Sequence, residues 1–315
     1  MFMKVFCCLC LLVVLLPGCN SQDAAAPKED ETKEIDISEI AQNYPLINGS
    51  TSALPLMQEI YKAMHEPGII NGEKVWEGLP QSVYQTVMSY IMLIEGGIDV
   101  AIVTEPSKEV LEYAAEAGVE LECTPICLEA LIFITNPEVT VESLGTDQLR
   151  KIYIDRQIDN WSQLGGENAK IEALTRNQDS GSYSLMEKFV LQGEKADEEI
   201  ESRSMMASMV AMIEDVIRYN YMDGDSLPLG YTLYYYFQHN KKDKQWDDVK
   251  ILDIDGVEPN GATISSRQYP YSTYYYAVIR SDTSAGSAAR TLISWLLSDE
   301  GQRIISNAGF GNIAN

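Results

Sequence analysis

The chain has 315 residues and a formal net charge of −24, with 47 acidic and 23 basic side chains. A surface this acidic repels nucleic acid, so we expect no nucleic-acid partner. The chain contains six cysteines, and only Cys123 and Cys127 lie beyond residue 19, which excludes a disulfide-rich scaffold.

The N-terminal segment predicts export and membrane attachment. Residues 1–18 combine one lysine with an apolar run from Val5 to Leu16, which is typical of a signal peptide and too short to span a bilayer. The sequence LPGC that ends at Cys19 resembles the lipobox of bacterial lipoproteins, in which the cysteine is acylated, for example with palmitate. We therefore expect Cys19 to anchor the protein outside the cytoplasm on the bacterial cell membrane. Residues 19–43 are mostly polar and predict a flexible tether.

The remaining sequence alternates strand-like and helix-like segments. Short apolar runs are followed by amphipathic helical patterns, and the clearest runs are 44–49, 97–104, 130–135, 170–175 and 274–279. This alternation predicts an α/β fold with mostly parallel sheets flanked by helices. In such sheets, ligands bind beyond the carboxyl ends of the strands and against helix N-termini.

Hydroxyl-bearing residues stand at three predicted helix starts. They are Ser50-Thr51-Ser52 after the first strand, Ser82 in the segment GLPQSV, and Ser180-Gly181-Ser182, which Arg176 precedes by four residues. Ordinary helix capping accounts for each junction alone. Hydroxyls and free N–H groups beside a guanidinium nevertheless make a site that suits a tetrahedral oxyanion, and three such junctions in one exported chain favour binding.

Enzyme signatures are missing from the sequence. The two histidines, His65 and His239, have no partner at metal-ligand spacing, and the chain contains no HExxH, G-x-S-x-G or Walker motif. The sequence therefore predicts a protein that is not an enzyme, without catalytic residues, metal or cofactor.

The order and spacing of several motifs resemble the phosphate-binding lipoproteins of phosphate ABC transporters, which are type II periplasmic binding proteins. The motifs are INGSTSALPL, GGIDVAIVTEPS, IDNWSQLGG, TRNQDSGSYSLMEKF, LPLGY, VKILDIDGVEPN and TLISWLLSDEGQRIISNAGF. The resemblance implies two lobes, each a mostly parallel sheet flanked by helices, joined by two hinge strands. It places residues 44–125 and 262–315 in the first lobe and residues 126–261 in the second.

The same resemblance implies a monomer that binds inorganic phosphate between its lobes and delivers it to a transporter permease. The ligand-binding positions that it implies are Ser50, Thr51, Ser52, Ser82, Thr104, Arg176, Ser180, Gly181 and Ser182. One position departs from the family pattern, because Thr104 stands where well-known phosphate binders carry an aspartate that accepts the phosphate proton. Another oxyanion such as sulfate therefore remains an alternative ligand, and a sensor or adhesin lipoprotein that reuses the fold remains an alternative function.

Overall fold

The computed structural model describes residues 35–313, apart from residues 36, 204–207, 220–224 and 245. The predicted signal peptide and Cys19 lie outside the described residues. The segment Ile35–Asn315 forms one compact unit. Within the described residues, no helix combines the length and the apolar character that a bilayer span requires.

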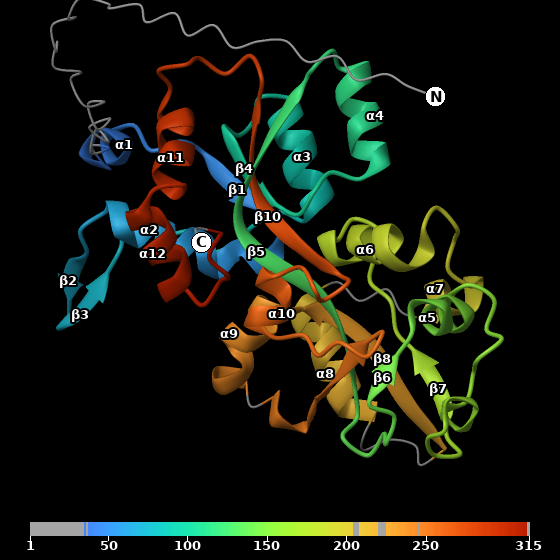
Figure 1. The fold of residues 1–315 in the computed structure, drawn as a ribbon. Coiled ribbons are helices and arrows are strands. Elements are labelled where there is room, and N and C mark those ends of the chain that lie inside the picture. Colours follow the sequence, from blue (N-terminus) through green and yellow to red (C-terminus); the bar gives the residue numbers. More distant parts are fainter. Residues whose placement is uncertain (1–34, 36, 204–207, 220–224, 245, 314–315) are drawn as a thin grey trace, which may run out of the picture. The chain divides into compact units, whose positions relative to one another are not determined.

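A mixed sheet forms the centre of this unit (Figure 1). Along its main path the strands follow the order β1, β4, β10, β5, β8 and β7, and β9 pairs with both β5 and β6. The strands are β1 (Ile47–Gly49), β4 (Val100–Val103), β5 (Leu121–Thr135), β6 (Ser143–Leu144), β7 (Lys170–Ala173), β8 (Ser226–Leu233), β9 (Lys250–Ile254) and β10 (Ser272–Arg280).

The long strand β5 belongs to both halves of the sheet. Its residues Leu121–Ala130 pair with β10, whereas Leu131–Thr135 pair with β8 and β9. We call the half that contains β1, β4 and β10 the first lobe and the half that contains β6, β7, β8 and β9 the second lobe. The change of partners falls between Ala130 and Leu131, while the residue boundaries expected from the sequence stay a prediction.

The sheet is mixed, which corrects the expectation of mostly parallel sheets. The pairs β1–β4, β7–β8 and β6–β9 are parallel, whereas every pairing of β10 with β4 or β5, and of β5 with β8 or β9, is antiparallel. The physical reason is the double passage of the chain between the lobes. Strand β5 leaves the first lobe and β10 enters it in the opposite direction, so the two strands lie antiparallel at the centre of the sheet.

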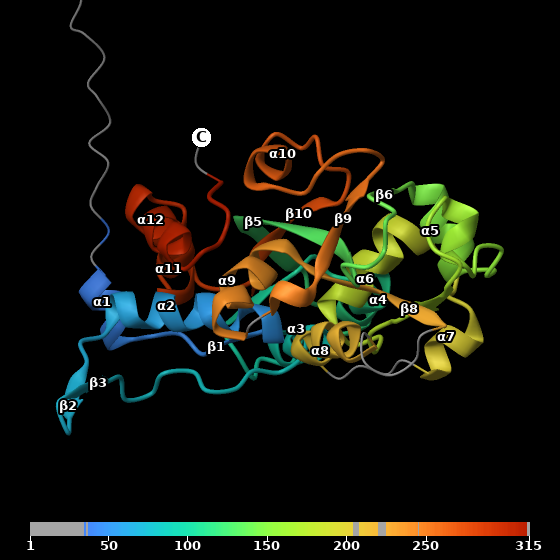
Figure 2. The same ribbon diagram turned by 90° about the horizontal axis from the view of Figure 1, so that it is seen from below.

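Helices and one hairpin complete the two lobes. Figure 2 shows α10 on one side of β5 and α8 on the other, and both contact this strand. The first lobe contains α1 (Ile37–Gln42), α2 (Leu54–Met64), the hairpin β2 (Gly68–Ile70) and β3 (Glu73–Val75), α3 (Thr86–Ile94), α4 (Lys108–Glu116), α11 (Ala288–Leu296) and α12 (Asp299–Asn307). The second lobe contains α5 (Thr146–Tyr153), α6 (Gly181–Met186) with a π turn at Glu187–Leu191, α7 (Glu198–Arg203), α8 (Met209–Tyr219), α9 (Tyr234–Lys244) and α10 (Gly261–Ser265).

The folded part begins earlier than the predicted tether allows. Residues 37–42 form α1, which packs against α2 and α11. Ile40 is fully buried, and Ile35 and Ile37 pack against the same core. Within the helix, Ile37 and Ile40 lie three residues apart and so share one face, which favours a helix packed on the core. A tether can therefore extend only to about residue 34.

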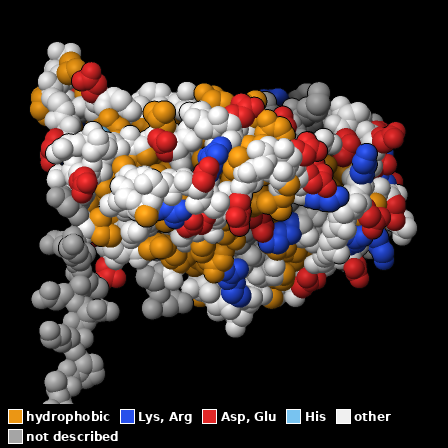
Figure 3. Space-filling view, turned by 90° about the horizontal axis from the view of Figure 1, so that it is seen from above, with side chains coloured by type: hydrophobic (Ala, Val, Ile, Leu, Met, Phe, Trp, Pro, Cys, Tyr) orange, Lys and Arg blue, Asp and Glu red, His pale blue; other side chains and the backbone are white. Residues whose placement is uncertain are grey.

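Charges of both signs are present on the surface. On the face drawn in Figure 3, acidic and basic side chains are interspersed, with apolar side chains between them. The large net charge therefore does not decide what a local site can bind, because solvent and salt screen charges that lie more than about 8–10 Å apart.

Candidate functional site

The loop that carries Arg176 is fixed by a buried tyrosine. The chain leaves β7 after Ala173, and the backbone N–H of Arg176 donates a hydrogen bond of 2.9 Å to the Tyr231 hydroxyl. The Thr175 hydroxyl also lies 2.9 Å from that hydroxyl. Tyr231 is fully buried on the neighbouring strand β8, so the direction of the loop is set by the core of the second lobe.

The guanidinium of Arg176 lies beside the start of helix α6. Its Nη1 donates to Ser182 Oγ over 3.4 Å, and the hydroxyls of Ser180 and Ser182 are 3.5 Å apart. Ser180 is the N-cap of α6, because its Oγ accepts from the backbone N–H of Tyr183. The predicted cap at Ser180 is confirmed. The Arg176 guanidinium and the N-terminus of a helix thus lie next to each other, and both favour the binding of an anion.

The predicted Ser50-Thr51-Ser52 junction faces the same region from the first lobe. Ser50 follows β1, and its backbone N–H donates to the carbonyl of Ile102 on β4 over 3.1 Å. The hydroxyls of Ser50 and Ser52 are 3.2 Å apart, and the Tyr275 hydroxyl on β10 donates to Ser52 Oγ. Ser50 and Ser52 are buried, so both hydroxyls are held in place by the sheet of the first lobe.

Helix α3 begins later than predicted. Ser82 is exposed, and the helix starts at Thr86 with Gln85 as its N-cap, so the predicted cap at Ser82 is wrong. Two hydrogen bonds hold the preceding segment out of the helix. Asn48 Oδ1 accepts from the backbone N–H of Tyr84 over 2.7 Å, and Gln58 donates to the carbonyl of Pro80. Thr86 replaces Ser82 as the hydroxyl at this helix start.

Two buried threonines face the start of α6. The Oγ1 atoms of Thr86 and Thr104 have no hydrogen-bond partner among the described residues. Thr86 is 3% exposed and Thr104 is 0% exposed. A Cβ atom added to Gly181 would lie 2.5 Å from Thr104 Oγ1 and 2.7 Å from Thr86 Oγ1, so both hydroxyls touch the backbone of Gly181. A buried hydroxyl without a partner is costly, and a ligand with oxygen atoms at this point would remove that cost.

These groups surround one small cavity. Its volume is about 10 Å³, close to the space that one water molecule needs, so in this arrangement of the lobes it excludes an organic metabolite. Its lining comes from both lobes and consists of Ser50, Thr51, Ser52, Gln85, Thr86, Arg176, Ser180, Gly181, Ser182 and Met209.

Most of the predicted positions therefore meet at one place. Seven of the nine line the cavity, Thr104 lies against the Thr86 and Gly181 contact, and Ser82 is not brought to the cavity. Sequence reasoning missed Gln85, Thr86 and Met209. Thr86 could have been found, because it is the hydroxyl that directly precedes the apolar residues of TVMSYIML. Gln85 and Met209 carry no comparable signal.

The cavity is electrically suited to an anion. Among the described residues that line it, Arg176 is the one that carries a formal charge, and no carboxylate is present. Burial lowers the pKa of the Arg176 guanidinium from its ordinary value, while nearby Tyr231 and Tyr236 act in the opposite direction. The charged form of Arg176 therefore carries a desolvation cost, and an anion held against the guanidinium would offset that cost.

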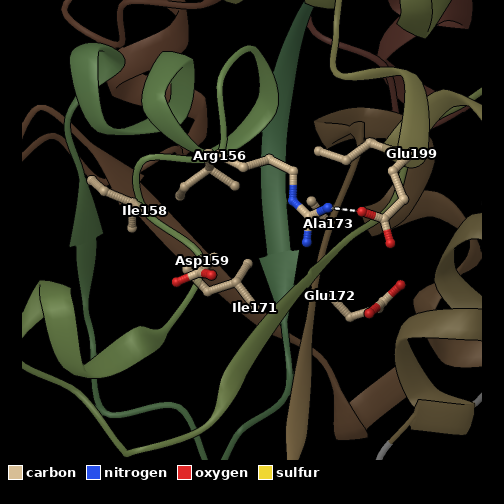
Figure 4. Close-up of a pocket in the computed structure, with 9 residues that line it drawn as sticks. Arg156, Ile158, Asp159, Ile171, Glu172, Ala173 and Glu199 are labelled. Atoms are coloured by element: carbon tan, nitrogen blue, oxygen red, sulfur yellow. Dashed lines mark hydrogen bonds and ion pairs between the residues drawn. The ribbon is translucent and has the colours of Figure 1, made fainter.

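Another pocket in the second lobe does not have this character. Figure 4 shows Arg156 directed toward Glu199, with which it forms an ion pair, while the carboxylates of Asp159 and Glu172 also line the pocket. Its volume is about 20 Å³. Three carboxylates against one guanidinium disfavour an anion, and none of the predicted site residues lies here. Within the described residues, no group of three His, Cys, Asp or Glu side chains could hold a metal ion.

Comparison with known proteins identifies the family. A family model described as the PBP superfamily domain matches residues 85–300, which is more than half of the chain. The chain belongs to the PBP superfamily. The resemblance seen in the sequence motifs is thereby confirmed for the family.

Two curated relatives of this PBP superfamily protein are named phosphate-binding protein PstS. The protein from Borreliella burgdorferi is 28% identical over 278 residues, which cover 84% of this chain and 88% of that protein. The protein from Bacillus subtilis is 26% identical over 178 residues, which cover 56% of this chain and 52% of that protein.

A solved structure supports the same architecture. The X-ray structure of a phosphate ABC transporter substrate-binding protein with bound phosphate, from Clostridium perfringens, matches with a TM-score of 0.63. The sequences are 22% identical, and the match covers 85% of this chain and 98% of that chain. At this identity the likeness establishes the fold, and it confirms the two-lobed periplasmic-binding-protein architecture expected from the sequence.

Proposed function

We propose that this chain binds inorganic phosphate between its two lobes and delivers it to the permease of an ABC transporter. The observation that carries the proposal is the cavity itself, in which buried Arg176 and the start of α6 face the unpartnered hydroxyl of Thr86 from the other lobe. The unpartnered hydroxyl of Thr104 lies against Gly181 at the same helix start. The names of the PstS relatives support the same ligand.

The physics of this site favours a compact oxyanion that is stripped of water. A dehydrated dianion is stable in a protein only when most of its oxygen lone pairs meet donors. Arginine, serine and threonine side chains and the amides at a helix start supply such donors. Each charge-assisted hydrogen bond contributes about 1.5–3 kcal/mol, so several together give micromolar or tighter binding. Because the donors come from both lobes, we expect binding and lobe closure to be one event.

Calorimetric titration of Arg176 variants tests the proposal. Arg176→Ala removes the fixed positive charge of the cavity and should weaken phosphate binding by about 3–5 kcal/mol. Arg176→Lys keeps the charge without the planar two-donor geometry, so it should lose somewhat less binding free energy than Arg176→Ala. Arg156→Ala is the matched control, since that arginine lies in the pocket of Figure 4 and is paired with Glu199. Its phosphate affinity should equal that of the wild type.

The ligand alternatives are separated by the same titration. The cavity has no carboxylate among its described lining residues, and Thr104 can both donate and accept a hydrogen bond, so it does not select for a protonated anion. If wild type binds sulfate as tightly as phosphate, the protein is a general oxyanion binder. If it binds neither phosphate, sulfate nor arsenate in the micromolar range, the proposed function is wrong and a sensor or adhesin role takes its place.

The proposal includes membrane attachment through Cys19 and a monomeric, non-enzymatic protein outside the cytoplasm. It is supported by the lipobox-like sequence LPGC and by the polar residues that follow it. Cys19→Ala should yield a folded protein that binds phosphate normally and no longer sediments with membranes. Fractionation of cells that express both forms, with phosphate binding as the control for folding, measures this. Unchanged sedimentation of the variant would exclude the lipid anchor.

A further inference from the structure

A second and larger cavity lies beside the oxyanion cavity. Its volume is about 440 Å³, within the range of about 300–1,000 Å³ that is typical of pockets for small organic molecules. One wall is formed by α3 and α4 of the first lobe, and the other by the segment from Gln178 to Lys195 of the second lobe. The two cavities are neighbours along the chain, because Val87 and Asp179 of the large cavity adjoin Thr86 and Ser180 of the small one.

The inner surface of this cavity is apolar. Tyr90 and Ile94 of α3, Val110 of α4 and Tyr183 of α6 are buried and line it. The hydroxyl of Tyr90 donates to the carbonyl of Thr104, so its ring is held in a fixed position. Such a surface suits an aromatic or aliphatic body and offers tyrosine rings to a cationic group.

The outer part of the cavity is acidic. Four carboxylates, from Glu109, Asp179, Glu187 and Glu194, and the lysine Lys195 are among the residues that line it. Glu194 forms an ion pair with Arg150, so the acidic character rests on the other three carboxylates. Glu187 is partly buried, and its pKa is raised by burial and further by the nearby carboxylates of Glu109 and Glu201. These like charges repel one another across the cavity, and a cation placed between them would remove that repulsion.

We propose that this cavity binds a small organic cation, an ammonium or guanidinium group carried on a short apolar body. The apolar surface and the volume select the body, and the acidic rim selects the positive charge and rejects a second oxyanion. Because the walls belong to different lobes, the cation favours the same closed arrangement that assembles the oxyanion cavity. Cation and phosphate should therefore raise each other's affinity by the same factor. This coupling rests on the proposed function, whereas binding of the cation does not.

Calorimetry with phenethylammonium chloride at low ionic strength tests the cation site. We expect saturable binding with a Kd of roughly 0.1–1 mM, the range for a ligand of this size, and weaker binding as salt is added. Glu187→Gln and Glu109→Gln should each lower the affinity for the probe at least about fivefold. The uncharged probe 2-phenylethanol should bind wild type more weakly than phenethylammonium does, by a similar factor.

A matched variant and a narrowed cavity control this experiment. Glu112→Gln removes a carboxylate from α4 that pairs with Lys108 and does not line the cavity, so its probe affinity should be unchanged. Ile91→Trp should narrow the cavity and weaken probe binding at least about fivefold, while thermal unfolding shows a folded protein. Absence of saturation at about 10 mM, or wild-type probe affinity in Glu187→Gln or in Ile91→Trp, would overturn the proposal.

The coupling is measured by titrating phosphate with and without saturating probe. We expect phosphate affinity to rise at least about twofold, and probe affinity to rise by the same factor when phosphate is saturating. Identical phosphate affinities in the two titrations would overturn the coupling. Failure of the proposed function is a separate result, since wild type would then bind no phosphate while the phosphate-free probe titrations still decide the cation site.

Discussion

At the scale of single residues, Gly181 marks a close contact between the two lobes. Any Cβ at this position would overlap the hydroxyls of Thr104 and Thr86, at 2.5 Å and 2.7 Å. Both threonines are buried in the first lobe, so they have little room to move away. Gly181 therefore serves the approach of the lobes, and a helix start alone would not require glycine here.

Gly181→Ala should consequently impair ligand binding more than folding. We expect phosphate affinity to fall by at least about tenfold, because a methyl group prevents the lobes from closing around the ligand. Gly261→Ala is the matched control, since Gly261 is also the first residue of a helix and its Cβ would meet only the Tyr235 hydroxyl at 3.8 Å. That variant should bind phosphate normally and be neutral or more stable by about 0.4–1 kcal/mol. Calorimetry and denaturant unfolding of both variants check this, and wild-type phosphate affinity in Gly181→Ala would contradict it.

The residues of the candidate site were largely predictable from local sequence. Arg176, Ser180 and Ser182 are close in the chain, and the rule that polar groups gather at helix starts brought them together with Ser50 and Ser52. The contact of Thr86 with Gly181 could not be derived in this way, because it depends on how far the second lobe approaches the first. Neither helix propensity nor capping chemistry predicts the distance between the two lobes.

At the scale of elements, the start of α3 shows how tertiary contacts override local preference. Serine is a better N-cap than glutamine, so the sequence favours a start at Ser82. The hydrogen bond from Tyr84 to Asn48 ties the segment to β1 and keeps it out of the helix up to Gln85. This contact joins residues 36 positions apart, and such long-range pairing is absent from the rules that predict helix ends.

The mixed sheet has a similar origin. Alternating strands and helices correctly predicted an α/β fold, and the five clearest strand-like runs all overlap strands of the structure. The rule that such alternation gives parallel sheets fails for β5 and β10, which pair antiparallel through the junction of the lobes. Hydrophobic pattern shows that a strand is buried, but it does not show in which direction the neighbouring strand runs.

At the scale of the whole molecule, the junction of the lobes contains a buried carboxyl group. Glu129 lies on β5 two residues before Leu131, where the strand changes partners, and it is fully buried. Its Oε1 accepts hydrogen bonds of 2.9 Å from the backbone N–H groups of Ala130 and of Tyr235 at the start of α9. Burial raises its pKa from 4.5 to about 8, although these amides act in the opposite direction.

This carboxyl group should make the free energy of unfolding depend on pH. Below about pH 4.5 Glu129 is protonated in both states, so its contribution to stability is fully present. As the pH rises toward 8, the unfolded chain releases the proton while the folded chain retains it, and stability falls until the folded carboxyl group also ionises near pH 8. Each pKa unit corresponds to about 1.4 kcal/mol, so the total loss is on the order of a few kcal/mol.

Glu129→Gln isolates this effect, because glutamine retains the acceptor for α9 and cannot ionise. Denaturant unfolding between pH 5 and 9 should show wild type losing a few kcal/mol relative to the variant, with the difference constant above about pH 8. Glu122→Gln on the same strand is the matched control, since that carboxylate is partly exposed and pairs with Arg290, and its profile should follow wild type within about 1 kcal/mol. Parallel pH profiles for wild type and Glu129→Gln would show that Glu129 ionises normally in the folded protein.

Because Glu129 joins β5 to α9 at the junction of the lobes, its ionisation should also loosen that junction before global unfolding. The rate of hydrogen exchange at the amides of Ala130 and Tyr235 rises with pH in both proteins, because exchange is base-catalysed. Between pH 6 and 9 we expect this rate to rise more in wild type than in Glu129→Gln.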